Sequence, residues 1–454
     1  MRNRFVAVIG AGLTGLTAAF YLKKQGIPFR VFDSAKKAGG VIQSQTDGEF
    51  VWETGPSTGT IGKPEVAELF EDLGEDIIEI APGISGNRYI WKAGKLHALP
   101  SGIISGLKTP LFSWKDKFGM PLEPFRPRGD NPEENLTTFV KRRLGQSILD
   151  YAVDPFVSGI YAGSPDTIVP KYALPKLYAL EENYGSFILG SIHKMREPKT
   201  ARDRKATKKI FSTKGGLSTL IKTLVKHIGE ENLALGADKL FILRSGGTYN
   251  LHLDGQKQAF TDVIFTGGAP RLLEAFPFLE GAKVDDAFKV RYASVVEVAV
   301  GFRTWLGFEL DGFGALMPSK ENRRILGVLF MSSLFQNRAP KGGAMLSTFL
   351  GGERHPEYYE LPDDEIFNLV KEELSETLSI PSFDPSVFNI ARHKFAIPQY
   401  DVQTPKRMAA YKEIERQNSG LFVGGNGVGG IGIADRIRQG RELAERVLTE
   451  SKLN

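Results

Sequence analysis

The chain has 454 residues, a length that predicts two or three domains of roughly 150 residues each and excludes a small disulfide-stapled fold. Because it contains no cysteine, thiolate catalysis, cysteine-ligated zinc and iron–sulfur clusters are excluded, so any redox group must be a bound cofactor. The net charge of +5 suits an anionic substrate or an anionic membrane surface and argues against a nucleic-acid partner, and no apolar run approaches the roughly 20 residues that span a bilayer.

The strongest motif lies near the start of the sequence. An apolar run over residues 5–9 predicts a buried parallel strand, and it leads directly into the glycine turn Gly10, Gly12 and Gly15. A helical pattern and a second strand follow, and that strand ends at Asp33. In such a βαβ unit the glycines permit a tight turn, close approach to a pyrophosphate and close helix packing, while the acid binds a ribose. The segment therefore predicts a dinucleotide site, and the lack of a signal-peptide pattern before it leads us to expect a cytoplasmic protein.

Two further segments favour FAD over NAD. Gly39 and Gly40 follow Asp33 closely, and the turn over residues 53–58 would extend the cradle past the nucleotide. The second segment is a glycine cluster over residues 424–433, which follows a short apolar strand.

The C-terminal cluster repeats the GxGxxG spacing at Gly425, Gly427 and Gly430. The residues that follow suffice for a helix over 434–448 but not for a returning strand with an acidic end. We therefore predict that the strand before the cluster, residues 420–423, rejoins the first sheet and that the helix directs N–H groups at the same cofactor. Without a second nucleotide unit, electrons would come from the substrate and leave to a diffusible acceptor such as O2.

The rest of the chain interrupts this nucleotide-binding unit twice. We predict an α/β fold in which a Rossmann-like FAD-binding domain is interrupted by a helical domain and by a mixed-sheet substrate-binding domain. The predicted ranges are 1–90, 206–285 and 395–454 for the FAD-binding domain, 91–205 for the helical domain and 286–394 for the substrate-binding domain. A basic stretch over residues 194–209 is predicted to be a solvated, mobile linker, with contact to an anionic surface as the alternative.

Several segments together resemble a known family. They are residues 10–15 with Asp33, Gly39 and Gly40, then 154–163, 175–177, 181–186, 215–217, 312–318, 398–400 and 424–440. Over almost its entire length the chain resembles the oxygen-dependent protoporphyrinogen oxidases of the flavin-containing amine oxidase superfamily. Residues 156–163 are the most specific part, because general flavoprotein chemistry does not require them. The resemblance implies a soluble or monotopic FAD enzyme that removes six hydrogens from a porphyrinogen and converts O2 to hydrogen peroxide.

The resemblance also assigns site residues, none of them an acid–base catalyst or a metal ligand. The FAD contacts are Gly10, Ala11, Gly12, Leu13, Thr14, Gly15, Asp33, Gly39, Gly40, Gly55, Pro56, Ser57, Thr58, Asn426, Ile431, Gly432 and Ile433. The substrate contacts are the backbone of Gly159 and the side chains of Leu316 and Phe349. The chain departs from its relatives at Val41, Lys239 and Ile104. Candidates for holding substrate carboxylates are Arg88, Lys95, Arg392 and Lys394.

Alternative functions stay open at this point. Protoporphyrinogen IX is the leading substrate, coproporphyrinogen III is the nearest rival, and an amine oxidase or desaturase of the same superfamily would use another substrate. A flavoprotein without catalytic activity is the alternative from another class. The aromatic, apolar segment over residues 103–118 suggests peripheral contact with an anionic membrane on its cytoplasmic face, and a homodimer is left open.

Overall fold

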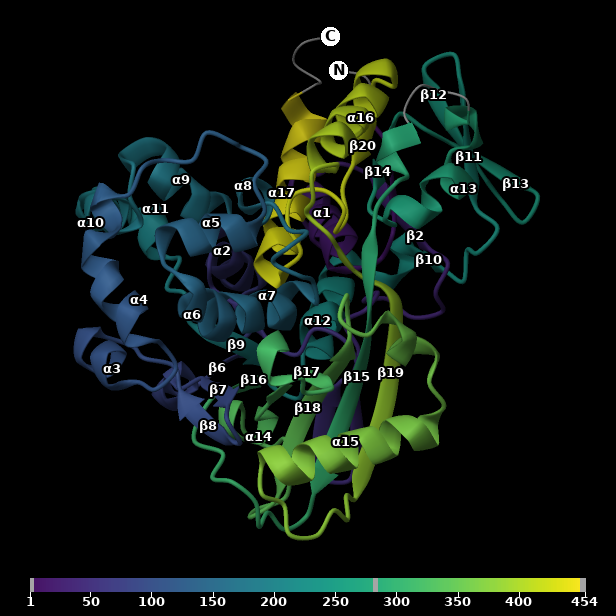
Figure 1. Cartoon of the computed structure of the whole chain (residues 1–454). Coiled ribbons are helices and arrows are strands. Elements are labelled where there is room, and N and C mark those ends of the chain that lie inside the picture. Colours follow the sequence, from purple (N-terminus) through teal and green to yellow (C-terminus); the bar gives the residue numbers. More distant parts are fainter. Residues whose placement is uncertain (1–3, 281–284, 450–454) are drawn as a thin grey trace.

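A parallel sheet of five strands forms the centre of the predicted FAD-binding unit in the computed structural model, which describes residues 4–280 and 285–449 (Figure 1). Its strand order is β10-β2-β1-β14-β20. The bounds are β1 Val6–Ile9, β2 Phe29–Asp33, β10 Leu233–Leu235, β14 Asp262–Phe265 and β20 Leu421–Val423. Val6 and Val8 pack against one layer, and Ala7 and Ile9 against the other, since alternate residues of a strand face opposite sides.

Helices cover one face of this sheet and a small antiparallel sheet covers the other. The covering helices are α1 Leu13–Lys24, α2 Pro64–Leu73, α12 Ser218–Ile228 and α17 Ile433–Thr449. The opposite layer contains β11 Phe241–Ser245, β12 Thr248–Leu253, β13 Gln256–Phe260, α13 Leu272–Ala275 and α16 Thr404–Gln417. The short strands β3 Ser44–Asp47, β4 Phe50–Glu53, β5 Gly59–Thr60, β6 Ile78–Ile80 and β9 Ile210–Thr213 connect this unit to the rest.

The two ends of the chain meet in this unit, as the sequence predicts. Strand β20 pairs with β14 in parallel, and α17 lies beside α1 (Figure 1). The helices approach closely at Gly440, where a Cβ atom would lie 2.5 Å from the Thr14 carbonyl oxygen. Glycine is therefore the residue that this contact admits.

A mixed sheet of seven strands forms the lower half of Figure 1. Its order is β19-β15-β18-β17-β16-β7-β8, and helix α15 Asp363–Thr377 packs on one face. The strands are β7 Tyr89–Lys92, β8 Lys95–Ala98, β15 Tyr292–Phe302, β16 Gly314–Leu316, β17 Ile325–Leu329, β18 Ala344–Gly351 and β19 Val387–Pro398.

The ends of two predicted domains fall inside strands of this sheet. The prediction places residues 91–205 in a helical domain, but the hairpin β7–β8 begins before residue 91 and joins the sheet through parallel pairing of β7 with β16. Likewise, β19 continues past residue 394. The strands thus cross the boundaries predicted at 90/91 and 394/395, while the division into domains itself stays a prediction.

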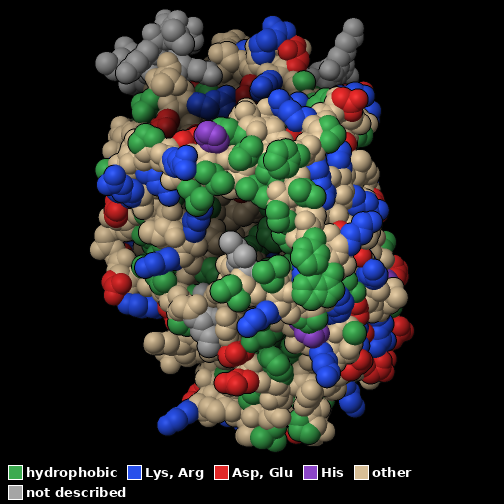
Figure 2. Space-filling view, turned by 60° about the vertical axis from the view of Figure 1, so that its left-hand side comes forward, with side chains coloured by type: hydrophobic (Ala, Val, Ile, Leu, Met, Phe, Trp, Pro, Cys, Tyr) green, Lys and Arg blue, Asp and Glu red, His purple; other side chains and the backbone are tan. Residues whose placement is uncertain are grey.

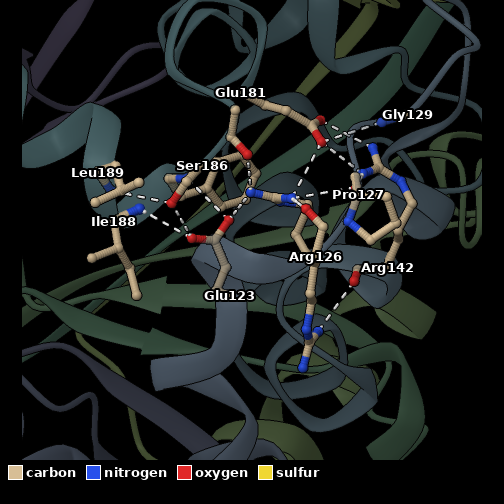
Figure 3. Close-up of polar contacts among 12 residues, drawn as sticks. Glu123, Arg126, Pro127, Gly129, Arg142, Glu181, Ser186, Ile188 and Leu189 are labelled. Atoms are coloured by element: carbon tan, nitrogen blue, oxygen red, sulfur yellow. Dashed lines mark hydrogen bonds and ion pairs between the residues drawn. The ribbon is translucent and has the colours of Figure 1, made fainter.

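Helices fill most of the remaining segment, at the left of Figure 1. They are α3 Ile103–Lys108, α4 Trp114–Gly119, α5 Leu136–Arg143, α6 Gln146–Ile148, α7 Asp154–Tyr161, α8 Pro170–Ala173, α9 Pro175–Tyr184 and α10 Phe187–Arg196. An ionic network joins three of them, α5, α9 and α10 (Figure 3). The Glu123 carboxylate pairs with Arg143 and accepts hydrogen bonds from the Ser186 hydroxyl and from the Phe187 backbone amide, which begins α10. The neighbouring Arg142 pairs with Glu181 at 2.6 Å.

The predicted mobile linker over residues 194–209 is wrong in its central part. Helix α11 Ala201–Arg204 lies within it, and Arg202 pairs with Glu65 at 2.6 Å and with Glu68 at 2.8 Å. Lys205 also pairs with Glu71. These carboxylates belong to α2, so ion pairs hold the basic stretch against the FAD-binding unit.

Candidate active site

The first glycine turn has the geometry of a phosphate cradle. Gly10 has φ +111°, a left-handed conformation that favours glycine, and at Gly15 a Cβ atom would lie only 1.9 Å from the Gly10 carbonyl oxygen. No atom lies within 4 Å of a Cβ placed on Gly12. Gly12 is also the N-cap of α1 and provides no side chain to bind the first N–H groups of the helix. The open space at Gly12 and the N–H groups at the start of α1, which include those of Leu13 and Thr14, fit a pyrophosphate.

Asp33 fixes the shape of this turn. One of its carboxylate oxygens accepts a hydrogen bond from the Ala11 amide at 2.6 Å, and the other accepts one from the Ala35 amide at 2.8 Å. Each oxygen has a second lone pair, so ribose hydroxyls can still bind. The Gly39 amide donates to the Ala11 carbonyl at 2.8 Å, which brings Gly39 and Gly40 against the same turn.

A cavity of about 160 Å³ opens at the carboxyl ends of β1, β2 and β14. Gly10, Asp33 and Phe265 line it, together with Asp238 and Leu240, the neighbours of Lys239. Ligands of open α/β sheets bind at this edge. The cavity therefore suits the adenosine part of a dinucleotide.

Thr266 joins the two glycine clusters. A Cβ on Gly10 would lie 2.5 Å from its hydroxyl oxygen, and a Cβ on Gly425 would lie 3.2 Å from its carbonyl oxygen. The C-terminal loop carrying Asn426, Ile431 and Gly432 therefore lies beside the first turn and leads into α17 at Ile433. This is the single site, closed by both ends of the chain, that the sequence predicts.

Two residues of α17 that the sequence analysis did not single out hold this loop. The Arg436 guanidinium donates to the carbonyls of Val428 at 3.1 Å and Gly430 at 2.6 Å, and the Gln439 carbonyl accepts from the Gly425 amide at 2.8 Å. Burial lowers the pKa of Arg436 to about 10, so it stays charged at neutral pH. The only signal in the sequence is their spacing of three residues, which places both on one face of the helix after the glycines.

The turn over residues 53–58 contacts both sheets. At Gly55 a Cβ atom would lie 2.0 Å from the Val41 carbonyl oxygen, so the turn packs against the segment after Gly39 and Gly40. On the other side, the Ser57 hydroxyl donates to Glu297 of β15 at 3.0 Å. Pro56, Ser57 and Thr58 therefore lie between the FAD-binding unit and the seven-stranded sheet.

The three predicted substrate residues are close together. Leu316, Gly327 and Phe349 are direct partners across β16, β17 and β18, which places Leu316 and Phe349 on the same face of the sheet. At Gly159 of α7, a Cβ atom would lie 2.6 Å from the Leu316 side chain. We call Leu316, Gly327 and Phe349 the apolar row.

A hollow opens on the face that carries the helical segment. Figure 2 brings this face forward and shows hydrophobic side chains gathered around the opening, with lysine and arginine side chains among them.

The carboxylate-binding candidates lie in different surroundings. Arg392 donates to the carbonyls of Tyr359 and Leu361 and pairs with Asp363 at 2.6 Å. Arg392 pairs in register with Val296, whose side chain packs on the α15 face, so Arg392 lies on the face opposite the apolar row. The remaining three candidates, Arg88, Lys95 and Lys394, are exposed.

Comparisons with known proteins agree with this geometry. The family model described as flavin containing amine oxidoreductase matches residues 13–448. Protoporphyrinogen oxidase 2, chloroplastic/mitochondrial, of Arabidopsis thaliana is 30% identical over 98% of this chain and 94% of its own length. Coproporphyrinogen III oxidase of Bacillus subtilis (strain 168) is 26% identical over 98% of both chains. The crystal structure of an Exiguobacterium sp. 255-15 protein assigned as a protoporphyrinogen oxidase superposes with a TM-score of 0.83 at 21% identity, covering 99% of this chain and 100% of that one.

The family match extends over nearly the whole chain, and the cradle, the cavity and the C-terminal loop fit a dinucleotide. The chain therefore belongs to the flavin containing amine oxidoreductase family and is an oxidoreductase with FAD as its cofactor.

Proposed function

We propose that this enzyme oxidises protoporphyrinogen IX to protoporphyrin IX, with O2 as the electron acceptor and hydrogen peroxide as the product. Six hydrogens leave the macrocycle in pairs, and each pair reduces one O2 molecule to one H2O2. The observation that carries the proposal is the apolar row, which faces Gly159 beside the turn predicted to hold FAD. The names of the relatives, which include protoporphyrinogen oxidases from plants and cattle, support it.

The chain's own residues would act by alignment. When bound, FAD supplies the electron-accepting chemistry. Phe349 and Leu316 offer an apolar surface to a macrocycle, and the glycine at position 159 lets α7 pack closely against the Leu316 side chain. Such a wall holds a substrate carbon in the geometry for transfer and excludes water from it.

A second candidate substrate is coproporphyrinogen III, which has two more carboxylates. Lys92, Lys108, Lys117 and Lys320 line a cavity of about 470 Å³. Lys92 lies two residues along β7 from Ile90, the register partner of Leu316, so it shares the face of the apolar row. The ammonium groups of Lys92 and Lys117 already donate to backbone carbonyls and Lys320 pairs with Asp150, so Lys108 is the lysine that would bind an additional carboxylate, with the others adding positive charge.

Parallel assays separate the two substrates. The purified enzyme is given each porphyrinogen under air, and porphyrin fluorescence and hydrogen peroxide are measured. Faster oxidation of protoporphyrinogen supports the first proposal, and faster oxidation of coproporphyrinogen supports the second. Oxidation of neither by an enzyme loaded with FAD would reject both. Lys108→Gln, at an exposed lysine of α3 that lines the cavity, should raise KM for coproporphyrinogen more than Lys115→Gln, a control at an exposed lysine of α4 that does not line it.

We also propose peripheral contact with an anionic membrane at its cytoplasmic face. The helical segment exposes a set of large apolar side chains: Ile104, Leu107, Trp114, Phe118, Leu122 and Phe125. The lysine cavity lies next to them and would attract acidic lipids. In the described part of the chain, none of the helices is both long and apolar enough to cross a bilayer. A homodimer stays an untested prediction.

Cosedimentation with vesicles containing anionic lipid tests this contact. We expect binding at low salt that weakens at high salt, because the lysines act through screened charge. Phe118→Glu should weaken vesicle binding. Leu306→Glu is the matched control, because the two side chains are similarly exposed, at 68% and 71%, and this variant should bind vesicles as the wild type does. Equal binding by both variants would contradict the proposed surface.

A further inference from the structure

Glu297 is a buried acid on the face of the sheet that carries the apolar row. It lies in the middle of β15 between valines and is 2% exposed. Its direct partner on β18 is Phe349, so the row continues from Leu316 through Gly327 and Phe349 to Glu297. Side chains paired in this way share one face of a sheet. A buried acid therefore lies beside the apolar row, which is predicted to hold the substrate.

One polar contact links the carboxyl group of Glu297 to the cofactor turn, while the Ser347 hydroxyl of β18 also favours its charged form. The Ser57 hydroxyl, itself only 5% exposed, donates to this carboxyl group at 3.0 Å. Within the described residues, no lysine, arginine or histidine forms an ion pair with Glu297. Buried carboxylates without a cation are costly, so a buried acid of this kind is held in its neutral form.

The charged groups around Glu297 do not offset a negative charge there. Glu53 of β4 is itself a buried acid, and Arg338 is engaged with it at 3.4 Å and with the Ser212 hydroxyl at 2.8 Å. His393 of β19 places its Nε2 atom 2.8 Å from the Thr54 carbonyl oxygen. Burial, and then the nearby Glu53, raise the pKa of Glu297 well above its ordinary value even though Ser57 donates to it.

We propose that Glu297, as a neutral carboxylic acid, is a positioning residue of this active site that fixes Ser57 and with it the turn over residues 55–58 against FAD. Its contact with Phe349 extends the same effect to the substrate wall, and that part rests on the proposed function. Loss of its proton as pH rises places an unpaired negative charge between the cofactor turn and the apolar row. Reduction of the flavin, which adds electron density nearby, then becomes less favourable.

The test compares Glu297→Gln, Glu297→Ala and Ser57→Ala in the FAD-loaded enzyme. The flavin absorbance spectrum and midpoint potential are recorded from neutral to alkaline pH, together with FAD affinity and Tm. Glutamine keeps the neutral shape and the acceptor for Ser57, so Glu297→Gln should keep FAD affinity and lose the pH-dependent change of the flavin that is expected of the wild type. Glu297→Ala and Ser57→Ala should each weaken FAD binding about tenfold, since each breaks the same buried hydrogen bond. The double variant should lose no more than either single one.

Glu373→Gln is the matched control. Glu373 is also a buried acid, but it lies on α15 and binds Arg323 and Arg324. This change should lower Tm without altering the pH dependence of the flavin. If Glu297→Gln keeps the wild-type pH-dependent change, or if Glu297→Ala keeps full FAD affinity, Glu297 only packs and the proposal is rejected. A wild-type enzyme inactive on both porphyrinogens would reject the proposed function alone, because the flavin measurements need no substrate.

Discussion

Gly12 and Gly15 belong to one motif but have different physical roles. Around Gly12 the protein leaves open space and the backbone φ is −75°, a value that any residue adopts. Gly12→Val should therefore fold and stay colourless, because the valine fills the space for the pyrophosphate. Gly15→Val should fail to fold, since its side chain would collide with the Gly10 carbonyl. Circular dichroism and flavin absorbance check both variants, and a yellow Gly12→Val protein would contradict the FAD site.

Asp33→Ala should weaken FAD binding by about 1–3 kcal/mol, a smaller effect than that of Gly12→Val. The change removes the ribose partner and also the acceptor for the Ala11 amide that shapes the turn. Titration of the apoprotein with FAD measures the loss. Asp47→Ala, at an exposed position of β3, is the control and should bind FAD as the wild type does. Equal FAD affinities of the Asp33→Ala and Asp47→Ala variants would show that Asp33 does not bind FAD.

The sequence predicts glycine positions well and buried polar partners poorly. A GxGxxG turn between a strand and a helix has a local cause, so Gly10 and Asp33 can be assigned from their neighbours in the chain. Arg436 acts through carbonyls of the loop before it, and Glu297 acts through Ser57 on another sheet. Neither contact follows from local propensity, because the Arg436 contact depends on the path of an irregular glycine loop and the Glu297 contact on how segments 240 residues apart pack.

At the scale of elements, Glu123, in the 3-10 helix Met120–Phe125 that follows α4, connects Arg143 of α5 to the first residues of α10. Glu123→Ala should destabilise the protein by about 3 kcal/mol, because it removes one of the two carboxylates that pair with the buried Arg143 and leaves only Glu181, at 3.5 Å. Urea unfolding measures the loss. Glu182→Ala, an exposed acid on α9, should change stability little. A loss no larger than that of Glu182→Ala would show that the network does not stabilise the helices.

The same network predicts a dependence on pH. Burial raises the pKa of Glu123, but hydrogen bonds from Ser186 and the amides of Phe187 and Ile188, with the charge of Arg143, together hold it below its ordinary value. A carboxyl whose pKa is lower in the folded state stabilises the protein at neutral pH, and this contribution is lost as pH falls through the folded-state pKa. The difference in unfolding free energy between wild type and Glu123→Gln should therefore shrink in acid. A difference that stays constant down to acid pH would contradict this assignment.

Elements with a local signal were predictable, and those fixed by remote partners were not. The predicted strand 420–423 and the helix after it match β20 and α17. The hairpin β7–β8 joins its sheet only through β16, which lies more than 200 residues later in the chain. The basic stretch around Arg202 suggests a linker until its partners on α2 are known.

At the scale of the whole molecule, the substrate wall and the FAD cradle belong to different sheets, so a change in one should leave the other intact. Phe349→Ala should lower kcat/KM for the porphyrinogen while FAD content and Tm stay close to wild type, because alignment is lost and the cradle is not touched. Phe367→Ala is the control, since Phe367 lies on α15, on the opposite face of the same sheet. Equal activity of the Phe349→Ala and Phe367→Ala variants would show that the substrate does not bind against Phe349.

Gly159→Leu should lower turnover more than Phe349→Ala. A side chain there first meets Leu316, so the leucine would push Leu316 into the space that a macrocycle needs. Activity is measured beside flavin absorbance and thermal melting. A folded, yellow Gly159→Leu enzyme with full turnover would show that substrate does not pass this position.

Because β20 and α17 complete a site that begins at β1, the order of synthesis bears on when the cofactor can bind. The ribosome makes the Gly10 turn first, yet the loop held by Arg436 and the helix that covers α1 emerge last. FAD capture is therefore expected to be a late event of biogenesis. In a nascent chain stalled before Gly424, the cradle would be open on one side. Binding of the flavin would therefore indicate that α17 has been synthesised.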